Sequence, residues 1–127
     1  MTTIFESAET YTLEDFDMGH QRLLIRRPKG QTHDDNMDII FEGVRYINIP
    51  TLMRGIVIRK GSGKSLEERQ HIKDYLVPGS HLYRIALQQS ECYIIASCMG
   101  IYTNSLEFYE TSLGNEYATR GELLLEA

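Results

Sequence analysis

The sequence has little of what stabilises secreted or membrane proteins. Its 127 residues include no Trp, three Pro and two Cys. No stretch approaches the roughly 20 apolar residues of a membrane-spanning helix, so we expect no contact with a membrane. The opening residues, MTTIFESAET, contain neither a basic region nor an apolar core, which argues against a signal peptide. Two cysteines form no disulfide framework, so we expect a protein of the reducing cytoplasm.

Motifs of catalysis and cofactor binding are also lacking. Residues 61–65, GSGKS, resemble the end of a phosphate-binding loop, but Ile58 occupies the position of that loop's first glycine. Cys92 and Cys98 lie on one predicted strand, about 20 Å apart at the rise of a β-strand, which is too far for a disulfide or a shared metal. The polar loop around His33 lacks the ligand spacing of a calcium site. We therefore expect no cofactor, no metal and no enzymatic activity.

Charges of one sign are missing from whole stretches of the chain. Residues 1–19 contain five acids and no Lys or Arg, whereas residues 20–30 and 51–64 each contain four bases and no acid. The net charge is −5, which makes nucleic acid a poor partner because phosphate binding needs a basic face. The blocks indicate that acidic and basic strands lie side by side and neutralise each other across a sheet.

Short alternations of apolar and polar residues dominate the remaining pattern and predict β-strands. The chain is predicted to form a single domain, 1–127, of the α+β class and predominantly β. Its antiparallel sheet of six to seven strands is either open or curled into a barrel or sandwich. The expected strands are residues 21–27, 37–49, 55–60, 81–88, 92–103 and 106–111.

Two features of this pattern have alternative interpretations. Gly43 shifts the alternation within residues 37–49, either as part of a tight hairpin turn or as a β-bulge, and we favour the bulge because a hairpin would leave a very short strand. Residues 3–18 and 116–127 have no clear assignment, although Gly121 would interrupt a terminal helix. The one predicted helix lies near residues 65–76, where Ser65 and Glu68 have the spacing of a capping box.

The strand phases also predict which side chains are buried. We expect Ile94 and nine others to form the core and to lose roughly 2–5 kcal/mol when a large one is truncated to alanine. The other nine are Ile39, Phe41, Ile56, Ile58, Tyr83, Ile85, Ala96, Leu106 and Phe108.

For function, the eight tyrosines favour a non-catalytic protein–protein interaction module, because tyrosine suits interfaces. Tyr93, Tyr102 and Tyr109 are predicted to share a sheet face that one short helix cannot cover. The partner would be another protein or a second copy of the chain docking through the sheet, and the acidic balance suits a toxin-neutralising or immunity-type protein. The alternative is a small-molecule-binding domain or enzyme. Its pocket would lie between helix 65–76 and the sheet, lined by Arg22, Arg26, His71 and His81.

Overall fold

The protein folds mainly as one antiparallel sheet of nine strands. The computed structural model describes residues 2–61, 70–114 and 117–127. The strands are β1 Thr2–Asp17, β2 Arg22–Arg27, β3 Asn36–Glu42, β4 Tyr46–Asn48, β5 Leu52–Gly61, β6 His81–Ala86, β7 Glu91–Ala96, β8 Cys98–Asn104 and β9 Glu122–Glu126. The described helices are the short α1, Gln70–Lys73, and a 3₁₀ turn, η2, Tyr117–Arg120.

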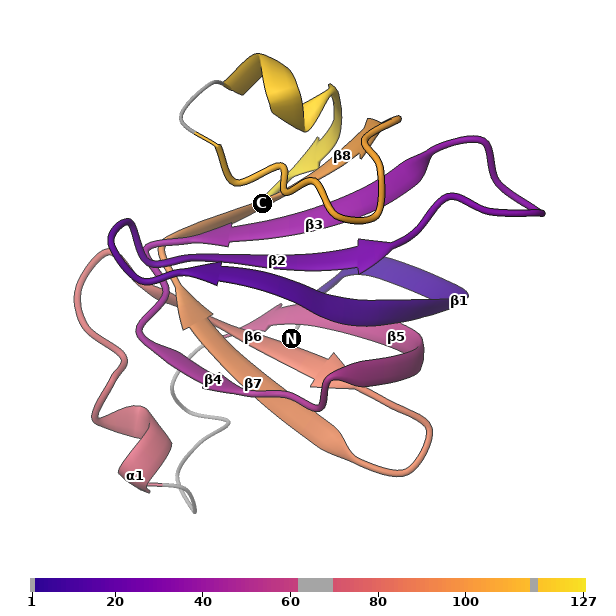
Figure 1. Cartoon of the computed structure of the whole chain (residues 1–127). Coiled ribbons are helices and arrows are strands. Elements are labelled where there is room, and N and C mark those ends of the chain that lie inside the picture. Colours follow the sequence, from indigo (N-terminus) through magenta and orange to yellow (C-terminus); the bar gives the residue numbers. More distant parts are fainter. Residues whose placement is uncertain (1, 62–69, 115–116) are drawn as a thin grey trace.

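The sheet folds over on itself without closing into a barrel. Its strand order is β4-β7-β6-β5-β1-β2-β3-β8-β9, so β4 and β9 are the two edges. The long strand β1 bends at several register shifts and pairs with both β5 and β2. As a result β1, β2, β3 and β8 lie on one side of the core, and β5, β6 and β7 lie on the other (Figure 1).

A corner at Gly43 carries two strands from one half of the sheet to the other. The ladder of β3 with β8 ends at Glu42 and Cys98, and that of β4 with β7 resumes at Tyr46 and Ile95. Residues 43–45 thus lie opposite only residues 96 and 97, and Gly43 has a φ of 65°. One extra residue in one strand is the definition of a bulge. The hairpin is therefore wrong, because β3 and β4 do not pair with each other. The extra residue agrees with a bulge, but the expected single strand 37–49 is wrong because residues 43–45 separate β3 from β4.

The core lies between the two halves of the folded sheet. It includes Tyr11, Leu23, Met53 and Met99 together with eight of the ten predicted core residues, all of them buried. Two smaller clusters pack on the outer faces. Ile72 of α1 covers β6 and β7, and Leu113, in the loop after β8, covers Leu24 and Ile40 on β2 and β3.

Several expected elements differ from the structure. The sheet has nine strands because β1 and β9 form in the unassigned terminal regions, residues 43–45 split 37–49 into β3 and β4, and Ser97 splits 92–103 into β7 and β8. Only residues 70–73 of the predicted helix are helical, while its capping residues and most of the GSGKS segment lie outside the described residues. Residues 106–111 form no strand, so Leu106 is only half-buried and Phe108 is 80% exposed. No helix in the described ranges is long and apolar enough to cross a membrane.

Candidate functional site

A buried ion pair lies on the outer face of β2 and β3. Arg26 and Asp38 are opposite each other in the ladder and are 1% and 0% exposed. Nε of Arg26 donates to Oδ1 of Asp38 at 2.7 Å, and Nη2 donates to Oδ2 at 2.9 Å. Burial by itself would lower the pKa of the Arg26 guanidinium, but the hydrogen bonds and charge of Asp38 outweigh burial and raise that pKa. The pair is therefore a fixed, bidentate anchor.

The same pair holds the loop that follows β8. Oδ2 of Asp38 also accepts hydrogen bonds from Oγ of Ser112 at 2.6 Å and from Nδ2 of Asn104 at 2.8 Å. Nη1 of Arg26 donates to the carbonyl oxygen of Glu110 at 2.8 Å. Breaking such a network would leave a buried charge without its partner, which is energetically costly. The network therefore fixes the loop to the sheet at residues 110 and 112.

Between these anchors and β8 the loop makes a tight turn. The N–H of Glu110 donates to the carbonyl oxygen of Glu107 at 2.9 Å, and Oε1 of Glu110 accepts from the N–H of Glu107 at 2.9 Å. Phe108 and Tyr109 occupy the two central positions of this β-turn and are 80% and 74% exposed. Their rings pack edge to face with centroids 5.4 Å apart. An anchored turn thus presents two aromatic rings to solvent.

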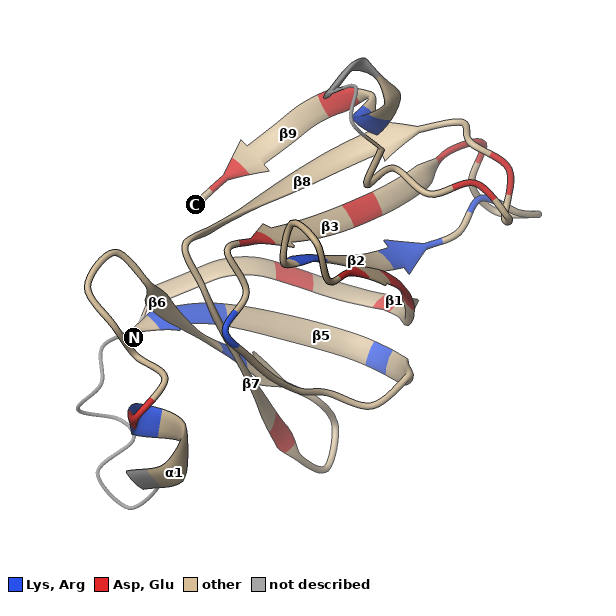
Figure 2. Ribbon diagram, turned by 60° about the vertical axis from the view of Figure 1, so that its left-hand side comes forward, with Lys and Arg blue, Asp and Glu red and all other residues tan. Residues whose placement is uncertain are grey.

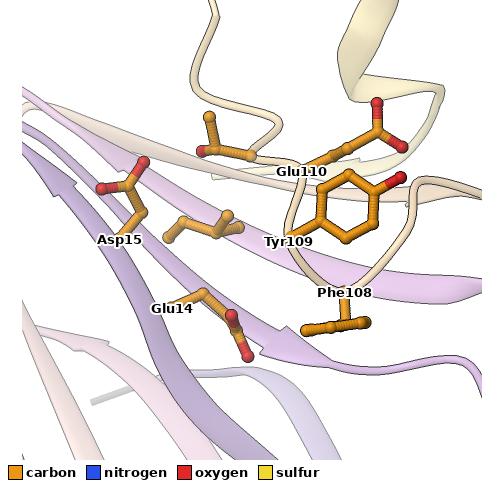
Figure 3. A pocket seen from close by; sticks show the side chains of 7 residues that line it. Glu14, Asp15, Phe108, Tyr109 and Glu110 are labelled. Carbon is orange, nitrogen blue, oxygen red and sulfur yellow. The ribbon is translucent and has the colours of Figure 1, made fainter.

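A hollow of about 380 Å³ separates this turn from β1. Figure 3 shows Glu14 and Asp15 of β1 on one side and Phe108, Tyr109 and Glu110 of the loop on the other. The complete lining is Glu14, Asp15, Leu24, Phe108, Tyr109, Glu110 and Thr111.

The lining carries three carboxylates and no basic side chain. None of the ion pairs within the described ranges involves Glu14, Asp15 or Glu110. The nearby bases have other partners, since Arg22 contacts Asp17 at 2.7 Å and Arg26 is bound by Asp38. A hollow lined by one sign of charge concentrates oppositely charged groups, so this one favours a cation.

The predicted neutralisation between acidic and basic blocks explains why the nearby basic side chains do not pair with the acids of the hollow. Figure 2 shows acidic residues on β1 beside basic residues on its neighbour β5. The bases of residues 20–30 pair with acids on adjacent elements: Arg22 with Asp17, Arg26 with Asp38 and Arg27 with Asp35. The interpretation is confirmed for that block, whose ion pairs within the described ranges do not include the acids around the hollow.

The three predicted interface tyrosines do not share one open face. Tyr93 is 2% exposed and packs with Ile72 of α1. Tyr102 is half-buried in the cluster of Leu113, and its ring centroid lies 5.6 Å from the Arg120 guanidinium. Only Tyr109 lines the hollow. The surface that was expected to be bare is covered by α1 at Tyr93 and by the loop after β8 at Tyr102.

The structure also does not bring together the four residues of the predicted pocket. Arg22 and Arg26 lie on β2, where both are buried and bound to carboxylates. His71 is exposed on α1 and His81 is half-buried at the start of β6, in the other half of the folded sheet (Figure 1). The hollow described above is lined by none of the four.

The two cysteines are poorly suited to nucleophilic chemistry. Burial raises the pKa of the Cys92 thiol. Burial and then the neighbouring Glu42 carboxylate raise the pKa of the Cys98 thiol. A raised pKa keeps a thiol protonated, whereas the thiolate is the reactive form. Across the described ranges, no group of three or more His, Cys, Asp or Glu side chains is placed to hold a metal ion.

Sequence reasoning missed most of the hollow. Phe108 was assigned to the core because Leu106 and Phe108 alternate as strand residues do, and Glu14 and Asp15 were counted only as members of an acidic block. A signal was present in the adjacent aromatic residues of 107–110, EFYE, because two neighbouring aromatics between two acids suit a turn better than a strand with one buried face.

Comparison of the chain with models of known protein families, with curated proteins and with solved structures gives no match.

Proposed function

We propose that the protein is a non-catalytic binding module that docks a positively charged segment of a protein partner in the hollow between β1 and residues 107–111. The observation that carries this proposal is the lining itself, which combines two exposed aromatic rings with three acidic residues that form no ion pair within the described part of the chain. Exposed apolar side chains rimmed by polar residues mark interaction sites more often than isolated surface hydrophobics do.

The two kinds of side chain would contribute differently to binding. Aromatic residues are enriched among the few residues that supply most of the affinity at interfaces. Carboxylates at a rim mainly steer a basic partner and raise its association rate. Because the Arg26–Asp38 network already fixes the loop, binding would order few additional residues, and this lowers the entropic cost of association.

The partner class is a protein with a basic surface segment. A basic toxin that this protein neutralises, in the manner of an immunity protein, is one partner of this kind. A second copy of the chain is a poorer match because its own net charge is −5.

The test is to titrate a fluorescent basic peptide of mixed Lys and Arg into the wild-type protein and two variants. Glu14→Gln combined with Asp15→Asn should weaken binding by about tenfold, the effect of losing two exposed charge contacts of roughly 0.7 kcal/mol each. Phe108→Ala should also weaken binding while leaving the melting temperature nearly unchanged, because its side chain is 80% exposed.

The matched control is Glu122→Gln combined with Glu126→Gln, which removes two exposed charges from β9. Binding to this variant should stay within about twofold of wild type, an effect below 0.5 kcal/mol. Equal losses in both double variants would mean that the peptide responds only to overall charge, and the proposed site would then be wrong.

A further inference from the structure

Two arginines of this chain are each held by a tyrosine ring together with a glutamate. The Arg120 guanidinium lies 5.6 Å from the Tyr102 ring centroid, and its Nη2 contacts Oε1 of Glu42 at 2.8 Å. The Arg84 guanidinium lies 5.7 Å from the Tyr93 ring centroid, and its Nε contacts Oε2 of Glu91 at 3.6 Å.

The chemistry of the guanidinium explains this pairing. It is planar and weakly hydrated, so it can place one face on an aromatic ring while its edge donates to a carboxylate. An ammonium group is a compact, strongly hydrated charge that makes no such flat contact. Within the described ranges, Lys60 lies 5.9 Å from the Tyr83 ring centroid, but none of the ion pairs there joins Lys60 to a carboxylate.

The hollow presents the same two components on its exposed surface. Tyr109 and Phe108 supply rings, Glu110 adjoins them in sequence, and Glu14 and Asp15 lie across the hollow on β1 (Figure 3). We infer that the group docked in the hollow is an arginine side chain of the partner, with its guanidinium stacked on one ring and hydrogen-bonded to a carboxylate of β1. This inference rests on the proposed function and specifies the recognised residue.

The test compares peptides that differ only in carrying arginine, lysine or citrulline at every basic position. The arginine peptide should bind wild-type protein about tenfold more tightly than the lysine peptide, the scale of a partly desolvated cation–π contact. The citrulline peptide, which keeps the planar group without its charge, should show no measurable binding.

Variants of the protein then separate the contribution of the aromatic rings to the arginine preference from that of the carboxylates. In Phe108→Leu combined with Tyr109→Leu, the preference for arginine should fall to about twofold or less because no ring remains to stack on. The control is Tyr75→Leu, which removes a half-exposed tyrosine that packs on Tyr46, and this variant should keep the full preference.

Any other outcome would contradict a specific part of the inference or of the proposed function. If arginine and lysine peptides bind equally and both lose binding in the Glu14→Gln, Asp15→Asn variant, arginine recognition is wrong and the proposed function stands. If neither peptide binds in a way that depends on those carboxylates, both are wrong. If the preference survives loss of both rings, the stacking arrangement is wrong.

Discussion

At the scale of single residues, the Arg26–Asp38 pair is the most consequential interaction in this structure. Its two side chains are almost completely buried, and Asp38 accepts hydrogen bonds from three different side chains. Asp38→Ala would leave the Arg26 charge buried without its partner. We expect a loss of about 3–5 kcal/mol in the free energy of unfolding, measured by urea denaturation.

A double replacement provides the control for this prediction. Arg26→Met combined with Asp38→Leu removes both charges, so it should cost less than Asp38→Ala alone. A loss below about 1 kcal/mol for Asp38→Ala, the size of an ordinary neutral hydrogen bond, would show that the pair does not anchor the loop.

The ionisation of Asp17 is expected to make the stability of the protein depend on pH. Hydrogen bonds from Arg22 and His20 lower the pKa of Asp17 to about 2, from an ordinary value of about 3.9. Because the folded pKa is below the unfolded one, the stabilisation is complete above about pH 4 and is lost as the pH falls toward 2. Asp17→Asn should therefore lower the melting temperature at pH 6, and this difference from wild type should shrink between pH 4 and 2. A difference that stays constant down to pH 2 would contradict this assignment.

At the scale of secondary-structure elements, the corner between β3 and β4 depends on one glycine. Gly43 has a φ of 65°, and a Cβ placed there would collide with the side chain of Ser97. Gly43→Ala should therefore destabilise the protein by more than about 1 kcal/mol, because alanine at a positive φ is strained and the collision adds to that strain. Thermal unfolding monitored by circular dichroism would measure the loss.

Gly30 offers a matched comparison. A Cβ placed at Gly30 would have nothing within 4 Å, and its φ is not in the left-handed range. Gly30→Ala should therefore change the stability by less than about 0.5 kcal/mol. Similar losses for both variants would mean that the corner imposes no special requirement on Gly43.

At the scale of the whole molecule, the open edge of β9 decides whether the chain associates with itself. Leu123 and Leu124 are about half exposed there, which would favour pairing with another strand. Antiparallel pairing of two copies of β9 about Leu124, however, would place Glu122 opposite Glu126, and like charges directly opposite are destabilising. Together with the net charge of −5, this repulsion favours a monomer.

Sedimentation velocity over a range of micromolar concentrations at low salt should therefore give one species with the mass of a single chain, 14.6 kDa. A dimer whose population grows with concentration would support docking of a second copy through the sheet. It would also contradict the preference for a different protein as the partner.

The sequence by itself determined the strands in which apolar residues recur at the core-facing positions. Apolar residues recur at the core-facing positions of β2, β3, β5 and β6, so those strands and eight of the ten predicted core residues are confirmed, although β2 and β3 are buried on their outer face as well. The irregularity at Gly43 was also predicted, because a shift in the phase of alternation is a local property, but the division of residues 37–49 into β3 and β4 was not.

Only the tertiary structure decided where the remaining segments lie. Leu106 and Phe108 alternate as in a strand, but the chain from Ser105 to Leu113 is instead bound by Arg26 and Asp38, which are more than 65 positions earlier in the sequence. Periodicity reports which side of a local segment is apolar and contains no information about such distant polar partners. The hollow with Phe108, Tyr109 and the β1 carboxylates arises from that long-range anchoring. The sequence therefore contains its residues but does not show that they lie close together.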